Sequence, residues 1–243
     1  MRIAVLSDIH ANLPALEAVL ADLAEIDQVW VLGDIVGYGP QPDEVISTLQ
    51  AMGARSVLGN HDGAAIGTVD AAYFNPDARK AIEWTAETID VNSRSYLATL
   101  PEVRRDGELT AVHGSPRDPI WEYITSSAIA ADNFEFFETR ICLFGHTHLP
   151  IAYRLVEGAG EAIPGLAGDV VTLDGGRALL NPGSAGQPRD GLPDAAYAIL
   201  DISDEATGTV SFHRVRYEVD RTQRLMRDAG LPARLVERLT YGR

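Results

Sequence analysis

Short apolar runs recur along the chain, and each one stops abruptly at a glycine, aspartate, asparagine or histidine. Short continuous apolar runs bounded by turn-forming residues are typical of strands that are buried on both faces. Open α/β sheets bind their ligands beyond the carboxyl ends of such strands, so the polar residues that follow the runs predict a site there. The runs IAVLS, VWVLG, SVLG, LTAV, ICLFG and ALL end before Asp8, Asp34, Asn60, His113, His146 and Asn181.

Helical patterns occupy the gaps between several of these runs. The pair Asn75-Pro76 has the sequence of an N-cap followed by proline at the first helical position. Ser126 or Ser127 is expected to cap a later helix. The predicted helical segments are 15–23, 42–53, 75–89, a short piece around 96–97, and 126–138.

The second half of the chain is rich in strand patterns instead. The sequence SFHRVRY alternates polar and apolar residues, as a half-exposed antiparallel strand does. The segment 158–168 contains glycine, alanine and proline and is predicted to be a hairpin loop, and 221–243 is predicted to be a helical tail interrupted at 230–232. The predicted strands are 151–156, 169–173, 177–180, 195–202 and 210–219.

An alternating β/α half followed by a strand-rich half indicates an α/β (α+β) fold, with two packed sheets and helices outside them. Hydrophobic residues make up 46% of the sequence, which is enough for a sizeable core. Because no linker, internal repeat or low-complexity tract divides the sequence, residues 1–243 are expected to form a single domain.

The chain is strongly acidic, with a formal net charge of −15 and a pI of about 4.7. This charge opposes binding to long nucleic acids and to anionic membranes, although bound cations would still attract a phosphate substrate. The single cysteine, Cys142, lies in an apolar run and is expected to be a buried strand residue. A cytoplasmic location is expected, because no stretch approaches the roughly 18 apolar residues of a membrane span and the first apolar run is too short for a signal peptide.

The side chains at the predicted strand ends are carboxylates, imidazoles and one amide, all of which bind metals in proteins. Seven such groups exceed the needs of one tetrahedral ion and suit two adjacent ions that share a carboxylate. Two ions roughly 3.5–4 Å apart form the usual clamp for in-line displacement at phosphorus. The seven candidates are Asp8, His10, Asp34, Asn60, His113, His146 and His148.

Two pairs of candidates are separated by a single residue, namely Asp8 with His10 and His146 with His148. An extended chain would place both members of each pair on the same side, because side chains alternate along a strand. Glycines adjoin the candidates at points where a backbone without Cβ can turn sharply or come close to an ion. They are Gly33, Gly59, Gly114 and Gly145.

Each motif also has an ordinary structural interpretation. An Asp-x-His pair arises by chance or as a helix cap, Gly-Asp is a common turn, and Gly-Asn-His-Asp alone would be a loop. Their joint occurrence in this order, each after an apolar run, favours a functional site. Five of the six histidines belong to these motifs, whereas His213 lies within a predicted strand and is interpreted as structural.

Together these motifs resemble the signature of the calcineurin-like metallophosphoesterases. The nearest resemblance is to small bacterial and archaeal phosphodiesterases and phosphatases of that family, which lack a large accessory domain. Their fold, a four-layer αββα sandwich of two mixed sheets flanked by helices, is therefore expected here. The resemblance spans residues 8–148 and covers Asp8-x-His10, Gly33-Asp34, Gly59-Asn60-His61-Asp62, His113-Gly114 and Gly145-His146-Thr147-His148.

The same resemblance implies a role for each matching residue. His61 would protonate the leaving oxygen, and Asp62 would orient or tune His61. Two divalent cations would lower the pKa of a shared water, and the resulting hydroxide would attack phosphorus in line. Family members use Mn, Fe, Ni, Co or Zn, of which manganese is expected here. One ion would be held by Asp8, His10, Asp34 and His148, and the other by Asp34, Asn60, His113 and His146.

Two further segments are candidates for substrate binding. Arg117 could contact a phosphate bidentately, with Trp121 and Tyr123 flanking a base or an aryl group. The alternative is that Arg117 and Asp118 form a surface pair and the aromatic residues belong to the core. Arg189, in a loop that resembles one found in many relatives, could also reach the site, although a turn-forming structural role fits this loop equally well.

The expected function is that of a dinuclear, metal-dependent phosphoesterase acting on a small phosphate ester or nucleotide. Phosphodiester or nucleotide cleavage is favoured over protein phosphatase activity, and a diadenosine-tetraphosphatase-like role stays open. One rival hypothesis is a non-catalytic scaffold of the same fold, against which the complete set of ligands argues. The other is a single-metal or zinc-storage protein, which the stoichiometry of bound metal would separate from the dinuclear enzyme. An exposed edge strand or the C-terminal helix could support a homodimer.

Overall fold

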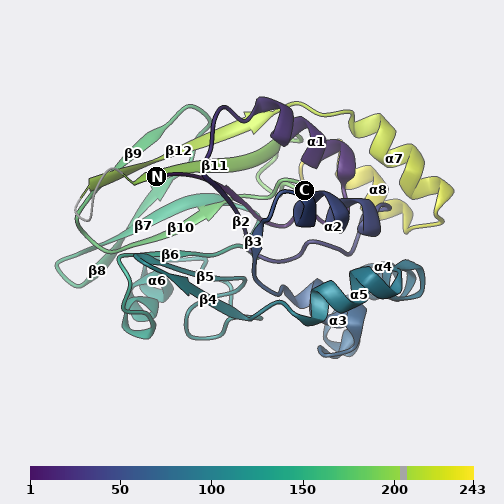
Figure 1. Ribbon diagram of the computed structural model, residues 1–243, viewed down its shortest axis with the longest axis horizontal. Coiled ribbons are helices and arrows are strands. Elements are labelled where there is room, and N and C mark those ends of the chain that lie inside the picture. Colours follow the sequence, from purple (N-terminus) through teal and green to yellow (C-terminus); the bar gives the residue numbers. More distant parts are fainter. Residues whose placement is uncertain (203–206) are drawn as a thin grey trace.

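The protein contains two six-stranded sheets that pack face to face, as Figure 1 shows in a computed structural model that describes residues 1–202 and 207–243. The strands of the first sheet are β1 (Arg2–Leu6), β2 (Gln28–Val31), β3 (Arg55–Ser56), β9 (Val170–Asp174), β11 (Ala195–Ile202) and β12 (Thr207–Val215). Those of the second are β4 (Val103–Asp106), β5 (Leu109–Val112), β6 (Ile141–Leu143), β7 (Pro150–Val156), β8 (Ala159–Pro164) and β10 (Ala178–Pro182). The strand orders are β3-β2-β1-β11-β12-β9 and β4-β5-β6-β10-β7-β8.

Both sheets combine parallel and antiparallel pairs. In the first, β1 and β2 run parallel, β2 and β3 run parallel, and β1 pairs antiparallel with β11, with Val5 opposite Ala198. In the second, β5, β6 and β10 run parallel, and β10 pairs antiparallel with β7. The parallel strands bring their carboxyl ends together at one end of each sheet, which is where the sequence predicts the site.

The hydrophobic core follows the alternation of side chains along the strands. In β1, Ile3 and Val5 point into the core between the two sheets, whereas Ala4 and Leu6 pack against the outer helices. All four side chains are at most 2% exposed. Full burial of a side chain such as Val5 or Leu6 contributes about 1.5–3 kcal/mol, so this alternation sets the register of the central strands.

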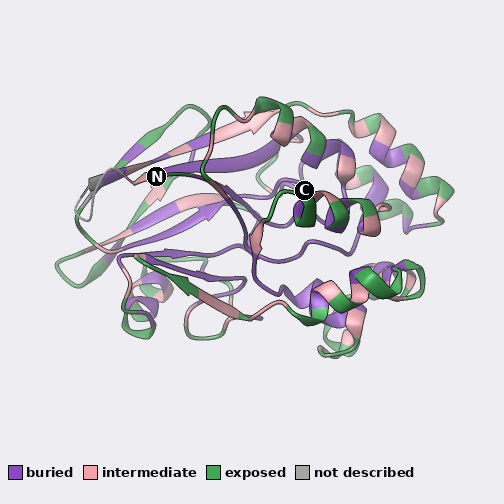
Figure 2. Ribbon diagram, in the orientation of Figure 1, coloured by how far each residue is buried: buried purple, intermediate pink, exposed green. Residues whose placement is uncertain are grey.

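Helices cover both outer faces and leave the central strands buried between them (Figure 2). The first sheet is covered by α1 (Leu13–Asp22), α2 (Pro42–Ala51) and α5 (Val91–Ala98). The second is covered by α6 (Ser127–Asn133) and the 3-10 helix η2 (Phe134–Phe136). A separate apolar cluster joins α3 (Asn60–Ile66), η1 (Ala71–Tyr73) and α4 (Pro76–Thr88) to α7 (Val219–Asp228) and α8 (Ala233–Arg238). These layers confirm the predicted αββα sandwich.

Local signals predicted several element boundaries correctly. The side chain of Asn75 accepts a hydrogen bond from the Ala78 amide at the start of α4, and Ser126 caps α6 in the same way. The helical tail is interrupted at 230–232, as predicted, and Cys142 is fully buried in β6. No helix within the described residues is both long and apolar enough to cross a membrane.

Two predictions of secondary structure were wrong. The segment 158–168 is not simply a loop, because residues 159–164 form β8 and pair residue by residue with β7. Its glycine and alanine content weakens the strand signal without preventing backbone pairing. The last strand ends at Val215 instead of 219, since α7 begins at Val219. In addition, the polar edge strand β4 escaped prediction because its sequence, VRRD, has no apolar alternation.

Candidate metal centre

The seven predicted ligands come together at the carboxyl ends of strands from both sheets. Asp8 follows β1 and Asp34 follows β2, whereas His113 follows β5 and His146 follows β6. Asn60 is the first residue of α3, directly after the loop that leaves β3. Each of these side chains is at least 97% buried, so the cluster is enclosed by protein. Its members are Asp8, His10, Asp34, Asn60, His113, His146 and His148.

The backbone at the strand ends is left-handed, so the predicted extended geometry of the two Asp-x-His and His-x-His pairs was wrong. Among the described residues, eight other than glycine have positive φ, and five of them are predicted ligands. Such conformations cost roughly 1–3 kcal/mol each and persist only where the surroundings enforce them. The ligands therefore converge through strained turns. The five φ angles are 53° for Asp8, 50° for His10, 50° for Asp34, 64° for His146 and 60° for His148.

Backbone hydrogen bonds hold these turns in place. The amide of Asp8 donates to the Gly33 carbonyl at 3.1 Å, and that of His10 donates to the Asp34 carbonyl at 2.9 Å. The loops after β1 and β2 are thus joined along their length. A Cβ added at Gly59 would collide with the backbone and the carboxylate of Asp34, so glycine is required for the third loop to approach.

Each of the two central carboxylates uses one oxygen for structure and leaves the other for the cluster. Asp8 Oδ2 accepts from the Ser7 hydroxyl at 2.6 Å and from the His146 amide at 3.1 Å, whereas its Oδ1 is buried with no hydrogen-bond partner within the described residues. Asp34 Oδ1 accepts from the His61 amide at 2.9 Å. Asp8 Oδ1 and Asp34 Oδ2 remain as candidate ligand atoms.

Two groups of side chains converge on these free oxygens. In the first, His148 Nε2 lies 3.2 Å and His10 Nε2 lies 3.9 Å from Asp8 Oδ1. In the second, His113 Nε2 lies 3.5 Å from Asp34 Oδ2, 2.9 Å from His146 Nδ1 and 3.0 Å from Asn60 Oδ1. Asp34 Oδ2 is also 3.7 Å from His10 Nε2, so this carboxylate lies between the two groups.

Backbone carbonyls determine the tautomers of three histidines. A carbonyl only accepts, so each of these rings carries its proton on Nδ1 and turns an Nε2 lone pair toward the cluster. The Nε2 atoms of His10 and His148 are 3.4 Å apart, and lone pairs that face each other at this distance repel unless a cation lies between them. The three bonds run from His10 to Val36 at 3.2 Å, from His113 to Leu32 at 2.8 Å, and from His148 to Gln187 at 2.6 Å.

The electrostatics of the cluster also favour cations. Burial lowers the pKa of the four imidazoles, most strongly for His10 and His146, which keeps them neutral and able to bind metals. Burial together with the charges of Asp8 and Asp62 raises the pKa of Asp34 well above its usual value. Bound divalent cations would supply the positive charge that the buried Asp34 carboxylate lacks. Imidazole with carboxylate suits Mn, Fe, Ni, Co or Zn.

His61 borders the cluster without belonging to either group of predicted ligands. Its ring packs against Tyr38 and Phe74, with ring centroids 4.3 Å and 4.8 Å away. Burial and the charge of Arg189 lower its pKa well below the usual value. The ring lines a cavity of about 150 Å³ that opens beside the cluster, and it is therefore placed where a substrate would meet it.

Among the described residues, the carboxylate of Asp62 forms no hydrogen bond with the ring of His61. Its carboxylate accepts from the amides of Val36 at 2.9 Å and Gly59 at 3.0 Å, and burial raises its pKa to about 6 against these bonds. His61 Nδ1 is buried without a hydrogen-bond partner among the described residues. Asp62 therefore links the loops that carry Asp34 and Asn60, a positioning role that spacing alone does not indicate.

The structure places the two candidate substrate arginines differently. Arg189 lines the cavity beside the cluster, whereas Arg117 is absent from its lining residues. Trp121 and Tyr123 do line this cavity, together with Tyr73 and Phe74. Tyr123 stacks on His146 with a centroid distance of 3.8 Å and is 45% exposed, so it belongs to the rim of the site and not to the core.

Arg117 pairs with Glu122, not with the adjacent Asp118. Its Nε donates to Glu122 Oε1 at 3.1 Å, and Ser115 and Asn133 donate to the same carboxylate. Although partial burial opposes it, these hydrogen bonds lower the pKa of Glu122 to about 2. The network fixes the loop that presents Trp121 and Tyr123 to the cavity.

Replacing Arg117 with alanine is therefore expected to lower the melting temperature at pH 7 and to leave KM for small phosphate esters within about twofold. Since the pKa of Glu122 is depressed on folding, the lost stability should shrink as pH falls from about 4.5 toward 2. Melting curves across this pH range, with KM measured in parallel, test both points. A several-fold rise in KM at unchanged melting temperature would return Arg117 to the role of a substrate ligand.

Four residues that line this cavity escaped prediction from the sequence, namely Tyr38, Tyr73, Phe74 and Asn75. Tyr38 packs its ring against His10 and His61, and Asn75 lines the same cavity as His61. Tyr38 lies between Gly37 and Gly39, and this glycine-rich run after Asp34 was a usable signal of a backbone turned toward the site. Asn75 gave only the signal of a helix cap.

Comparisons with known proteins agree with this geometry. The model of the calcineurin-like phosphoesterase superfamily domain matches residues 1–205. The crystal structure of a metallophosphoesterase from Sphaerobacter thermophilus is 47% identical, covers 100% of this chain and 99% of its own, and superposes with a TM-score of 0.91. An uncharacterized protein from Methanocaldococcus jannaschii is 35% identical over 99% of this chain and 98% of its own length. A symmetrical bis(5'-nucleosyl)-tetraphosphatase from Aromatoleum aromaticum is 30% identical over 44% of this chain and 40% of its own length.

Two mixed sheets with an imidazole–carboxylate cluster at their strand ends define a metal-dependent phosphoesterase, which is a hydrolase. The chain belongs to the calcineurin-like phosphoesterase superfamily.

Proposed function

We propose that this chain is a dinuclear phosphoesterase that hydrolyses phosphodiester or phosphoanhydride bonds in small nucleotide-like molecules. One cation would be held by Asp8, His10, Asp34 and His148, and the other by Asp34, Asn60, His113 and His146, with manganese as the expected metal. When bound, the two cations would polarise the phosphoryl oxygens and activate a water molecule for in-line attack. The observation that supports this proposal is the arrangement of the ligand atoms. Imidazole nitrogens without a proton and carboxylate oxygens without a hydrogen-bond partner converge on two points, and Asp34 belongs to both.

The remaining chemistry is assigned to residues that line the cavity. Arg189 would bind the phosphoryl oxygens, because it lines the same cavity as Asp34 and His61. His61 would give its proton to the leaving oxygen. Burial and the charge of Arg189 keep the pKa of His61 low, and an anionic phosphate beside the ring would raise it, since a negative neighbour favours the imidazolium.

The aromatic rim supports a nucleotide-like substrate. Tyr73, Trp121 and Tyr123 line the cavity beside His61 and could stack on a base or an aryl group. The partial match to a symmetrical bis(5'-nucleosyl)-tetraphosphatase supports the same substrate class, although it covers 44% of this chain. The protein is proposed to act in the cytoplasm, in keeping with the expectation from its sequence.

The expected result of the direct test is metal-dependent hydrolysis of bis-p-nitrophenyl phosphate in preference to p-nitrophenyl phosphate. Activity should appear with added Mn²⁺ and disappear with a chelator. Mn²⁺ at about 100 times its Kd should also raise the melting temperature by about 5–10 °C. A folded protein that binds the metal but hydrolyses neither compound would favour a scaffold of the same fold, and a stoichiometry of one ion would favour a single-metal site.

A further inference from the structure

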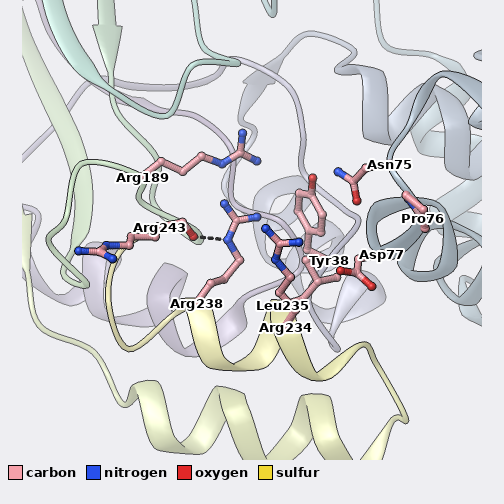
Figure 3. A pocket seen from close by; sticks show the side chains of 9 residues that line it. All are labelled: Tyr38, Asn75, Pro76, Asp77, Arg189, Arg234, Leu235, Arg238 and Arg243. Carbon is pink, nitrogen blue, oxygen red and sulfur yellow. Dashed lines mark hydrogen bonds between the residues drawn. The ribbon is translucent and has the colours of Figure 1, made fainter.

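A second and larger cavity, of about 560 Å³, adjoins the cavity of the metal centre. The two share Tyr38, Asn75 and Arg189 in their linings, so they form one continuous depression. The far side of the larger cavity is formed by the C-terminal helix α8, from which Arg234 and Arg238 project (Figure 3). A ligand bound at the metal centre could therefore extend into it without crossing a barrier.

Positive charge is concentrated in this cavity against the trend of the whole molecule. The chain has a formal net charge of −15, yet four arginines line the cavity beside one acidic residue, Asp77. Figure 3 shows the guanidiniums of Arg189, Arg234 and Arg238 gathered near the ring of Tyr38, whereas that of Arg243 points away from them. Such a group of like charges is unfavourable unless an anion occupies it.

Aspartate and glutamate side chains do not neutralise these guanidiniums. Within residues 1–202 and 207–243, no ion pair of Asp or Glu involves Arg189, Arg234, Arg238 or Arg243. Arg189 donates one bond, to Gln187 at 3.3 Å, and Arg238 Nε donates to the backbone oxygen of Arg243. Most of the guanidinium N–H groups are therefore available to a ligand.

The local field agrees with this geometry. Partial burial, and then the positive charges of Arg189 and Arg234, lower the pKa of Arg238 to about 10. The group is still fully charged at neutral pH, so the cavity keeps several uncompensated positive charges. The Arg189 guanidinium also lies 6.0 Å from the Tyr38 ring centroid, on the boundary between the two cavities.

We propose that the arginine-lined cavity binds a second phosphate group of the substrate whose scissile phosphate lies at the metal centre. The substrates would then be phosphate esters or anhydrides that carry at least one further phosphate, such as a polyphosphate chain. Guanidinium forks match phosphate oxygens bidentately, and phosphate supplies the charge that the cavity lacks. This inference rests on the proposed phosphoesterase function, since that function places the scissile phosphate.

The test compares two substrates, diadenosine tetraphosphate and bis-p-nitrophenyl phosphate, in the metal-loaded full chain. The readout is the ratio of their kcat/KM values. In the double variant Arg234→Ala with Arg238→Ala, and in Arg234→Glu alone, this ratio is expected to fall by about tenfold or more. Arg234 is exposed, so its single variant should fold. Arg224→Glu, an equal change of charge at an exposed position of α7 outside this cavity, is the control.

Calorimetric titration with inorganic tripolyphosphate, without added metal, separates failure of the cavity from failure of the phosphoesterase function. Binding should be at least about tenfold weaker in Arg234→Glu than in Arg224→Glu. If the wild type hydrolyses neither compound, the phosphoesterase function fails. Tripolyphosphate binding that is weakened in Arg234→Glu but not in Arg224→Glu would then still support the anion site. An unchanged kcat/KM ratio in the double variant, or equal tripolyphosphate binding by the two charge-reversed variants, overturns the proposal.

Discussion

Replacing Asp34 with asparagine is expected to reduce kcat/KM by about 10³-fold or more and to lower the bound metal from two ions toward one or none. Asp34 Oδ2 lies between His10 and His113, so its loss weakens both groups of ligands at once. Metal ions supply several kcal/mol of transition-state stabilisation, and each 1.36 kcal/mol is a factor of ten in rate. Elemental analysis of metal content, together with steady-state kinetics, provides the measurement.

The isosteric amide should preserve the fold, because its oxygen can still accept from the His61 amide as Asp34 Oδ1 does. Asp228→Asn, at an exposed position of α7, removes the same charge away from the site and should leave both readouts unchanged. Two tightly bound ions and near wild-type activity in Asp34→Asn would remove Asp34 from its bridging role.

Asp34→Asn is also expected to raise the melting temperature of the metal-free protein at pH 7. Burial and the charges of Asp8 and Asp62 raise the pKa of Asp34 well above its value in the unfolded chain. At any pH above the unfolded-chain pKa, the ionised form of Asp34 therefore destabilises the folded state. A neutral amide removes this cost. The sign should reverse when Mn²⁺ is present, because the wild type then gains more from binding the metal than the variant does.

His61→Ala is expected to reduce kcat by about 10²–10⁴-fold on esters with poor leaving groups and far less on p-nitrophenyl esters. The p-nitrophenolate ion leaves readily without a proton, whereas phenolate benefits from a general acid. The comparison is therefore between bis-p-nitrophenyl phosphate and diphenyl phosphate. Because His61 lies outside both groups of predicted ligands, metal content should remain at the wild-type value.

His213→Ala is the matched control for this variant. His213 lies in β12 and stacks on Tyr197 with a centroid distance of 4.9 Å, as expected of a structural histidine, so its loss should affect stability and spare kcat. The outcome to watch is the metal content of His61→Ala. His61 lies close enough to His10 and Asp34 to share an ion with them, so a loss of metal would make it a ligand instead of a proton donor.

Much of the site could be predicted because each candidate ligand follows an apolar run. Asp8, Asp34, His113 and His146 stand directly after buried strands, and the sheets bring those strand ends together. Strand burial depends on local sequence, so an interruption by a polar residue at the same relative place in several strands is visible without a structure. The helix caps at Asn75 and Ser126 were local signals of the same kind.

The contacts of two residues, Asp62 and Arg117, could not be predicted in this way. Asp62 binds backbone amides instead of the neighbouring His61 ring, because α3 turns the two side chains apart. Arg117 binds Glu122, whose carboxylate is also held by Asn133, so its partner depends on how the loop packs against α6. Such choices depend on distances between segments that are remote in sequence.

By itself, then, the sequence determined most of the strands, their buried faces and the identity of the polar groups at their ends, since hydrophobic periodicity and turn residues are local properties. Only the tertiary structure decided which lone pairs face one another, which carboxylate oxygen is free, and which arginines gather beside the metal centre. Arg189 and Arg238 are separated by 49 positions in the sequence yet line one cavity with Tyr38. That proximity arises from the packing of α8 against the loops of both sheets, which no local pattern encodes.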